Sequence, residues 1–264
     1  MMTLNIYPIP AFRDNYIWII QNAEHAVVVD PGDAFPVLDY LQSNKLQLDA
    51  ILITHHHSDH TGGNLTLIDR FNVPVYGPSE ENISTVTHPV QEGDTVHLAT
   101  LPLTLEVINI PGHTRGHVAY FGSSQQSQPG KNILFCGDTL FASGCGRVFE
   151  GTPQQMYCSL QKLANLPDNT LVYCAHEYTL SNINFARTVE PNNIDLQKRE
   201  HRVTQLRSEN IPTLPTSIAT EKSCNPFLRC HLSEIIQAAC LYAEKKLEQP
   251  VEVFAALREW KNNF

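Results

Sequence analysis

Long apolar runs, paired cysteines and an excess of basic residues are all missing from this chain of 264 residues. A membrane-spanning helix needs about 20 consecutive apolar residues, and no stretch approaches that length. The N-terminal residues show no basic segment followed by an apolar one, so we expect no secretory signal. These features predict a cytoplasmic protein without a membrane partner.

The chain contains seven cysteines, an odd number, and none of them forms a Cys-x-x-Cys pair. They are Cys136, Cys145, Cys158, Cys174, Cys224, Cys230 and Cys240. This pattern favours free thiols in a reducing compartment over a disulfide framework. A cysteine nucleophile is the alternative, but the scattered thiols offer no single candidate.

Basic side chains are scarce, with 18 Lys and Arg against 27 Asp and Glu, and the formal net charge is -9. Residues 1–194 carry 8 basic and 18 acidic side chains, whereas residues 195–264 carry 10 and 9. An acidic main part argues against nucleic acid as a partner. The C-terminal part could receive an anionic ligand, although a solvated helical surface would have the same composition.

The first two-thirds of the chain have the pattern of short strands separated by turns. The expected strands are Asn15–Gln21, Ala26–Asp30, Ala50–Thr54, Val73–Tyr76, Thr95–Leu98, Leu103–Ile110, His117–Phe121, Asn132–Cys136 and Thr170–Cys174. A helix is expected to begin at Thr152, where Thr, Pro and Gln form a capping box. Residues 123–131 are polar and predict an exposed loop.

After about residue 178 the pattern changes to helices broken by prolines. The expected helices are Ser181–Val189, Asp195–Glu209, Leu232–Lys246 and Pro250–Phe264. The sequence therefore predicts a strand-rich domain, residues 1–178, followed by a smaller helical domain, residues 179–264.

Potential metal ligands are concentrated in His55-x-His57-x-Asp59-His60, directly after a buried strand. A single histidine is more often a structural residue than a ligand. So many polar groups at a strand end would be costly to desolvate, and a divalent cation relieves that cost. Imidazole and carboxylate without thiolate suit zinc, iron or manganese. The alternative is a polar, solvated loop.

Three other strands also end next to a potential ligand. His113 follows the strand that ends at Ile110, Asp138 follows Cys136, and His176 follows Cys174. Taken singly, each would be structural about as often as functional. Strand ends at one edge of a sheet converge, and such edges commonly hold sites. Their shared position therefore predicts one metal centre.

These ligands, in this order, resemble the metallo-β-lactamase superfamily. The resemblance implies an α+β fold, a four-layer αββα sandwich, with the helical domain appended. It also implies two divalent metal ions per chain. His55, His57 and His113 would hold the first, Asp59, His60 and His176 the second, and Asp138 would bridge them. His56 and Ser58 would point away from the metals.

Within the superfamily the chain resembles the glyoxalase II (hydroxyacylglutathione hydrolase) family over nearly its whole length. The resemblance rests on residues 137–141, 144–152, 175–179, 225–229 and 257–261. It implies that Arg258 and Lys261, on one face of the last helix, bind the glycine carboxylate of glutathione, although a solvated basic edge is the alternative. By the same resemblance, Tyr178 and Arg147 would be further glutathione contacts, although Tyr178 could instead be a core aromatic. Some members have Lys and Tyr where this chain has Arg147 and Phe149, so we leave Phe149 out of the predicted site.

The function implied is hydrolysis of S-D-lactoylglutathione and related thioesters to glutathione and D-lactate, the second step of methylglyoxal detoxification. A hydroxide that bridges the two metals would attack, with Asp59 as the catalytic residue that orients it. Zinc is the expected metal, with iron or manganese possible, and the chain is expected to be a monomer. The alternatives are a mononuclear iron glutathione-persulfide dioxygenase on the same fold and a non-catalytic metal reservoir. Asp14 and His117 are expected to be supporting or structural residues.

Overall fold

The computed structural model describes residues 4–123 and 131–264, so the loop predicted at residues 123–131 lies almost entirely outside the described residues. The N-terminal strands form a mixed sheet in the order β1-β2-β3-β4-β5-β6. Its strands are β1 (Asn5–Ala11), β2 (Asn15–Gln21), β3 (His25–Val29), β4 (Gln47–Leu52), β5 (Val75–Pro78) and β6 (His88–Val90). Because β3 to β6 are parallel, their carboxyl ends share one edge.

The second sheet has the order β14-β13-β10-β9-β8-β7. Its strands are β7 (Thr95–Leu98), β8 (Leu103–Asn109), β9 (Val118–Gly122), β10 (Ile133–Phe135), β13 (Leu171–Tyr173) and β14 (Thr216–Ser217). A small hairpin, β11 (Leu140–Phe141) and β12 (Gly144–Cys145), follows β10. Strand β14 comes from the C-terminal part of the chain and pairs with β13, so the two parts share one sheet.

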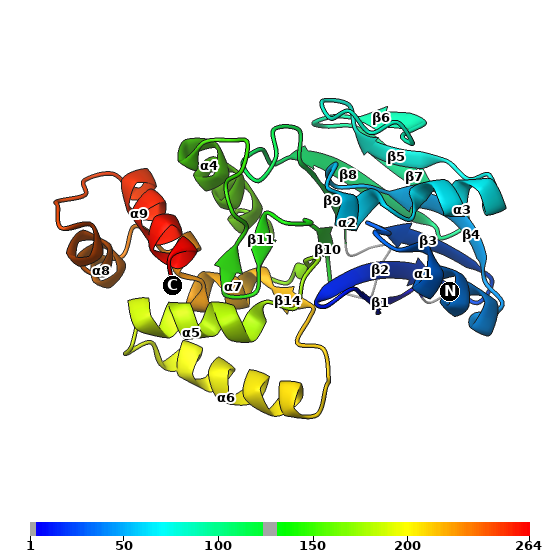
Figure 1. Ribbon diagram of the computed structural model, residues 1–264. Helices are drawn as coiled ribbons and strands as arrows, with labels where there is room; N and C mark the ends of the chain where they lie inside the picture. The colour runs from blue at the N-terminus through cyan, green and yellow to red at the C-terminus, as the bar shows by residue number, and fades with distance from the viewer. Residues whose placement is uncertain (1–3, 124–130) are drawn as a thin grey trace.

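Helices cover the outer faces of both sheets, as Figure 1 shows. Helices α1 (Ala34–Asn44) and α3 (Asn64–Phe71) pack on the first sheet through apolar residues such as Val37 and Leu67. Helix α4 (Pro153–Ala164) packs on the second sheet through Met156 and Leu160. The order helix, sheet, sheet, helix confirms the predicted αββα sandwich.

Alternation along the strands builds two separate apolar layers. In β2, Trp18 and Ile20 point into the interior between the sheets, whereas Ile17 and Ile19 point toward the helices. This follows from the two-residue period of a strand, and burial of each such side chain contributes about 1.5–3 kcal/mol.

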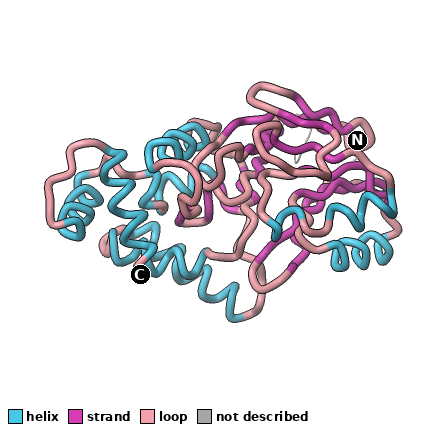
Figure 2. The backbone as a smooth tube through the Cα atoms, turned by 45° about the horizontal axis from the view of Figure 1, so that its top comes forward, coloured by secondary structure: helices cyan, strands magenta, loops and turns pink. Residues whose placement is uncertain are grey.

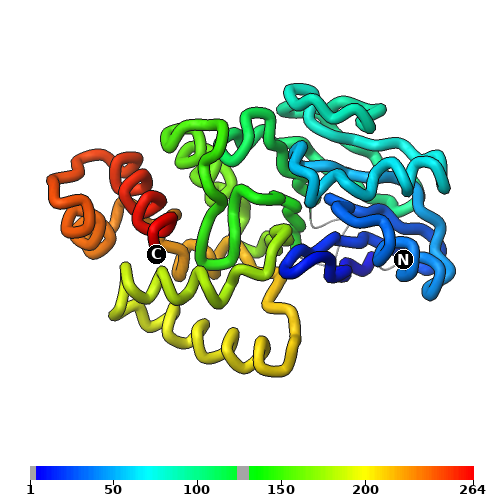
Figure 3. The backbone as a smooth tube through the Cα atoms, viewed as in Figure 1, coloured from blue at the N-terminus to red at the C-terminus, as the bar shows by residue number. Residues whose placement is uncertain are grey.

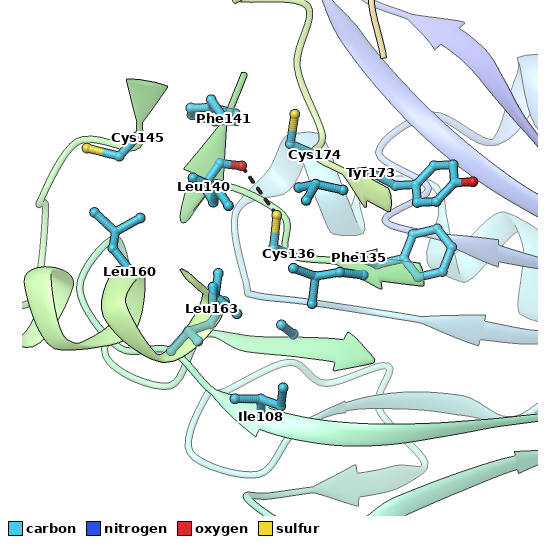
Figure 4. Packing of buried hydrophobic residues seen from close by; sticks show 14 of the residues in the cluster. Ile108, Phe135, Cys136, Leu140, Phe141, Cys145, Leu160, Leu163, Tyr173 and Cys174 are labelled. Atoms are coloured by element: carbon cyan, nitrogen blue, oxygen red, sulfur yellow. Dashed lines mark hydrogen bonds between the residues drawn. The ribbon is translucent and has the colours of Figure 1, made fainter. Parts of the chain in front are cut away.

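The hairpin of β11 and β12 is tied to the end of β10. The thiol of Cys136 donates a hydrogen bond to the carbonyl oxygen of Leu140 at 3.3 Å (Figure 4).

The C-terminal helices gather at one end of the sandwich (Figures 1 and 2). They are α5 (Thr179–Val189), α6 (Ile194–Ser208), α7 (Ile218–Cys224), a short 3-10 helix η1 (Pro226–Leu228), α8 (Ser233–Ala243) and α9 (Pro250–Asn262). The trace in Figure 3 shows that the last helix, in red, lies near segments from the middle of the sequence, in green. Tyr157 of α4 and Phe254 of α9 meet there, with ring centroids 6.1 Å apart.

Most predicted elements are present, with shifted ends. The capping box of Thr152 and Gln155 is confirmed at the start of α4. The helix expected to reach Lys246 ends at Ala243, because Glu244 has a φ of 51° and stops it. Helices α1 and α3 were not predicted. In the described ranges, no helix has both the length and the apolar character to cross a membrane.

Candidate metal centre

Four loops bring the predicted ligands together, and each loop follows a strand. Residues 55–61 follow β4 and include α2 (Ser58–Thr61), His113 follows β8, Asp138 follows β10 and His176 follows β13. The loops meet at one edge of the sandwich, where the main-chain nitrogen of Val118 donates to the carbonyl oxygen of Thr54 at 2.9 Å. The strand ends therefore converge as the sequence predicted.

Three histidine nitrogens form the first group. Nδ1 of His57 lies 3.0 Å from Nε2 of His55 and 3.1 Å from Nε2 of His113. Tetrahedral zinc with Zn–N bonds of about 2.0–2.1 Å separates its nitrogens by about 3.3–3.4 Å, so this spacing fits one cation. Burial lowers the pKa of all three imidazoles, which keeps a lone pair available at neutral pH.

The second group consists of Asp59, His60 and His176. Nε2 of His60 and Nε2 of His176 each lie 3.5 Å from Oδ2 of Asp59. Burial alone would raise the pKa of the Asp138 carboxyl, but the neighbouring His60 and His176 lower it well below its usual range. The second group of potential ligands therefore lies beside a charged carboxylate, that of Asp138.

Asp138 lies between the two groups and presents one oxygen to each. Its Oδ2 is 3.5 Å from Nε2 of His113, whereas its Oδ1 is 3.5 Å from Nε2 of His60 and 3.3 Å from Nε2 of His176. This geometry supports the predicted bridging role, which stays a prediction.

Among the buried atoms without a hydrogen-bond partner in the described residues are Nε2 of His60 and Oδ1 of Asp138, both at the centre. His60 is 1% exposed and Asp138 is 8% exposed. Leaving such groups unsatisfied costs about 1–3 kcal/mol each. A divalent cation would satisfy both, so the residues present fit metal binding.

Outer carboxylates lie behind three of the predicted histidine ligands, directly behind His60 and His176 and through a threonine behind His55. The hydroxyl of Thr54 donates to Asp30 at 2.7 Å and lies 3.1 Å from Nδ1 of His55. Nδ1 of His60 lies 3.1 Å from Asp30, and Nδ1 of His176 lies 2.8 Å from Asp14. Partners of this kind orient ligands and strengthen metal binding. The sequence analysis missed Asp30; its one signal was its position at the end of an expected strand.

His117 supports Asp138 from behind. Its Nε2 accepts the main-chain N–H of Asp138 at 3.2 Å, and its ring stacks on that of His55 with centroids 4.5 Å apart. Gly137 has a φ of 46°, and a Cβ there would lie 2.9 Å from the His117 ring. The contact therefore requires glycine before Asp138.

A cleft of about 620 Å³ runs from the metal centre to the last helix. Its lining residues include two predicted metal ligands, His113 and Asp138, and the basic residues Arg258 and Lys261 of α9. Arg147 and Tyr178 also line it, so all four predicted glutathione contacts face the same space as these two predicted ligands.

Main-chain and amide oxygens hold the two basic residues of α9. Nη1 of Arg258 donates to the carbonyl oxygen of Cys145 at 2.7 Å, and Nζ of Lys261 donates to Oδ1 of Asn182. Burial and the nearby Arg258 lower the pKa of Lys261 to about 8. Tyr178 stacks on His176 with centroids 4.7 Å apart.

The cleft also contains residues that the sequence analysis did not assign to the site. Phe149, left out for lack of a hydroxyl, lines the cleft and lies 5.2 Å from His113 between ring centroids. Phe141 and Asn182 line it as well. Two phenylalanines and an asparagine carry no sequence signal for a binding site. Only the folded chain brings residues 141, 149 and 182 to one surface.

The fold and the site define the class. The family model of the metallo-beta-lactamase superfamily matches residues 11–176. This part of the chain forms most of the sandwich and contains the histidines and aspartates that could hold a metal ion. The model of the hydroxyacylglutathione hydrolase C-terminus matches residues 177–264.

Curated relatives narrow the class to a family. A hydroxyacylglutathione hydrolase of Nitrosomonas europaea is 56% identical over 99% of this chain and 97% of its own length. One from Vibrio parahaemolyticus is 52% identical over 99% of this chain and 100% of its own. The chain belongs to the hydroxyacylglutathione hydrolase family of the metallo-β-lactamase superfamily.

Solved structures share the fold. ETHE1 from Myxococcus xanthus has a TM-score of 0.63 at 26% identity and covers 98% of both chains. The BLEG-1 B3 metallo-beta-lactamase has a TM-score of 0.62 at 23% identity, and the match covers 86% of this chain and 99% of the lactamase chain. The likeness to this lactamase concerns the fold alone.

Proposed function

We propose that this protein hydrolyses S-2-hydroxyacylglutathione thioesters, S-D-lactoylglutathione among them, to glutathione and a hydroxy acid. The observation that carries the proposal is the single cleft that joins the metal ligands to Arg258 and Lys261. A thioester carbonyl at one end and a peptide carboxylate at the other would fill it. The full-length relatives are named for this activity, so a persulfide dioxygenase is not favoured.

The metal centre is proposed to hold two divalent cations, zinc by preference, with iron or manganese as alternatives. His55, His57 and His113 would hold one, Asp59, His60 and His176 the other, and Asp138 would bridge them. Cations at such a site lower the pKa of bound water toward about 7 and polarise a carbonyl.

Asp59 is proposed to orient the attacking water. Its Oδ2 accepts a hydrogen bond from Nδ2 of Asn15 at 3.0 Å, and neighbouring His60 and Asn15 keep its pKa low. The carboxylate is therefore charged and fixed when a water's O–H turns toward it. The departing thiolate has a pKa of about 8.5 and needs little protonation, so the reaction requires no general acid.

Glutathione recognition is proposed for the other end of the cleft. Arg258 and Lys261 would bind the glycine carboxylate through charge-assisted hydrogen bonds. Arg147, exposed at the rim, and the hydroxyl of Tyr178 would contact the rest of the peptide. In this division of roles, residues 1–178 carry the chemistry and two of the glutathione contacts, and residues 179–264 supply the helix with the two carboxylate-binding residues.

The proposal also includes the oligomeric state and the location of the protein, which we propose to be a monomer in the cytoplasm. All seven cysteines are free in the structure, which suits a reducing compartment. Sedimentation of the purified protein tests the monomer.

The activity is tested by following three quantities on one preparation: metal content, loss of the thioester and oxygen uptake. We expect two cations per chain, rapid loss of S-D-lactoylglutathione and no oxygen consumption. Oxygen uptake with glutathione persulfide at one iron per chain would favour the dioxygenase instead.

A further inference from the structure

His56, the middle histidine of the run 55–57, is not part of either metal group. Its Nδ1 lies 2.9 Å from Oε2 of Glu81, and its Nε2 lies 3.3 Å from Oε1 of Glu150. The ring therefore contacts one carboxylate through each nitrogen, although it stands between two metal ligands in the sequence.

Glu81 joins the loop of His56 to the loop of His113. Its side chain is 3% exposed, and its Oε1 accepts hydrogen bonds from the hydroxyl of Thr114 and from the main-chain nitrogen of Gly116, the latter at 3.1 Å. A Cβ at Gly116 would lie 2.5 Å from Cγ of Glu81, so this approach needs glycine. The carboxylate thus ties two ligand-bearing loops that are far apart in the sequence.

Glu150 provides the second connection. Its Oε2 accepts the main-chain N–H of Arg115 at 3.1 Å, and its own N–H donates to the carbonyl oxygen of His113 at 3.3 Å. It follows Arg147 and Phe149, which line the cleft. His56 therefore connects three loops, those of residues 55–57, 113–117 and 147–150.

We infer that His56, through Glu81 and Glu150, is a positioning residue that sets the spacing of His57 and His113 and thereby the affinity for the first cation. The inference rests on the proposed metal centre. Nδ1 of His57 must meet nitrogens of two other loop residues at about 3 Å. His57 is half-buried, and its ring lies edge-on to the ring of His56 with centroids 4.9 Å apart, so the contacts that hold His56 also help to hold His57. Removal of supporting contacts of this kind typically costs about 10–100-fold in metal affinity.

The test measures zinc binding to the metal-free full chain by competition with a chromogenic chelator. The variants are His56→Ala and, as a second route to the same network, Thr114→Val. We expect each to weaken one of the two zinc ions about tenfold and to leave the other unchanged. Thr114→Ser keeps the hydroxyl donor to Glu81 and should restore the wild-type affinity. His97→Ala, an exposed histidine on β7, is the matched control.

Melting temperatures of the metal-free proteins separate positioning from stability. His56 has a side chain that is 34% exposed, so its removal should leave the fold intact. A lower melting temperature with two unchanged zinc affinities would mean that the network only supports the fold, and would overturn the inference while the proposed function stands. Wild-type protein that binds none of zinc, iron and manganese would overturn both.

Discussion

At one end of the cleft the functional side chains come from four strand-end loops, whereas at the other Arg258 and Lys261 come from one turn of α9. Most of the predicted ligand histidines are buried, and two of them, His60 and His176, contact the carboxylates of Asp30 and Asp14. The basic residues of α9 are held by uncharged oxygens, a main-chain carbonyl and the amide of Asn182. Both regions are proposed to bind charged groups, cations in the first region and an anion in the second.

The partners in each region determine which kind of ion the region favours. Carboxylates around the histidines favour bound cations, and they make the metal end dependent on every member of the network. Around Arg258 and Lys261 no described carboxylate forms an ion pair, so their charge is left for an incoming anion. The following variants test whether the two regions act separately, in order of expected effect.

The largest effect is expected for Asp138→Ala. This variant removes the oxygen that faces each ligand group and leaves His60 and His176 without their shared carboxylate. We expect metal content to fall and kcat to drop on the order of 10³-fold, at the upper end for loss of one electrostatic group. Metal analysis and steady-state kinetics check this. Asp69→Ala on α3 is the control, and two retained metals with normal turnover would refute the bridge.

Asp59→Asn should have the second largest effect. The amide keeps the shape but removes the charge that faces His60 and His176. We expect kcat to fall about 10²-fold, the lower range for a positioned proton acceptor, with an unchanged melting temperature of the metal-free protein. Unaltered turnover at every pH would exclude the proposed role.

The clustering of the predicted metal ligands could be predicted from the sequence, because residues 55–60 are adjacent in the chain and His113, Asp138 and His176 each follow an expected strand. Their division between two cations came from the family resemblance and stays a prediction. Asp30 and Glu81 could not be found, because only the packing of distant loops gives them partners. On α9 the spacing of Arg258 and Lys261 also fits a solvated edge, and their role as a clamp on glutathione came from the resemblance; the structure adds that both residues line the same cleft as Asp138.

Arg258→Ala tests whether the clamp acts on glutathione alone. A charge-assisted hydrogen bond contributes about 1.5–3 kcal/mol, so KM for S-D-lactoylglutathione should rise roughly ten- to a hundredfold. The contact is the same in ground and transition states, and kcat should change little. Kinetics at two salt concentrations check the charge contribution, because salt should weaken the wild type more than the variant.

A structural role for Arg258 predicts a different result, since its Nη1 also satisfies the carbonyl oxygen of Cys145. A simple thioester without the peptide distinguishes the two. If Arg258 binds glutathione, the variant and the wild type should hydrolyse the simple thioester at the same slow rate. Equal losses on both substrates would assign it to the fold. Arg202→Ala, exposed on α6, is the matched control.

The smallest effect concerns Lys261, whose pKa burial and Arg258 lower to about 8. A lysine binds a carboxylate when it is protonated, and this protonated fraction falls as pH rises through 8. KM for the glutathione thioester should therefore increase between pH 7 and pH 9, by up to about tenfold for one deprotonating group. The simple thioester, which lacks the carboxylate, should show no such rise. Lys261→Arg keeps its charge over this range, so its KM should stay constant. A KM that rises equally in this variant would place the titration elsewhere and leave the clamp to Arg258 alone.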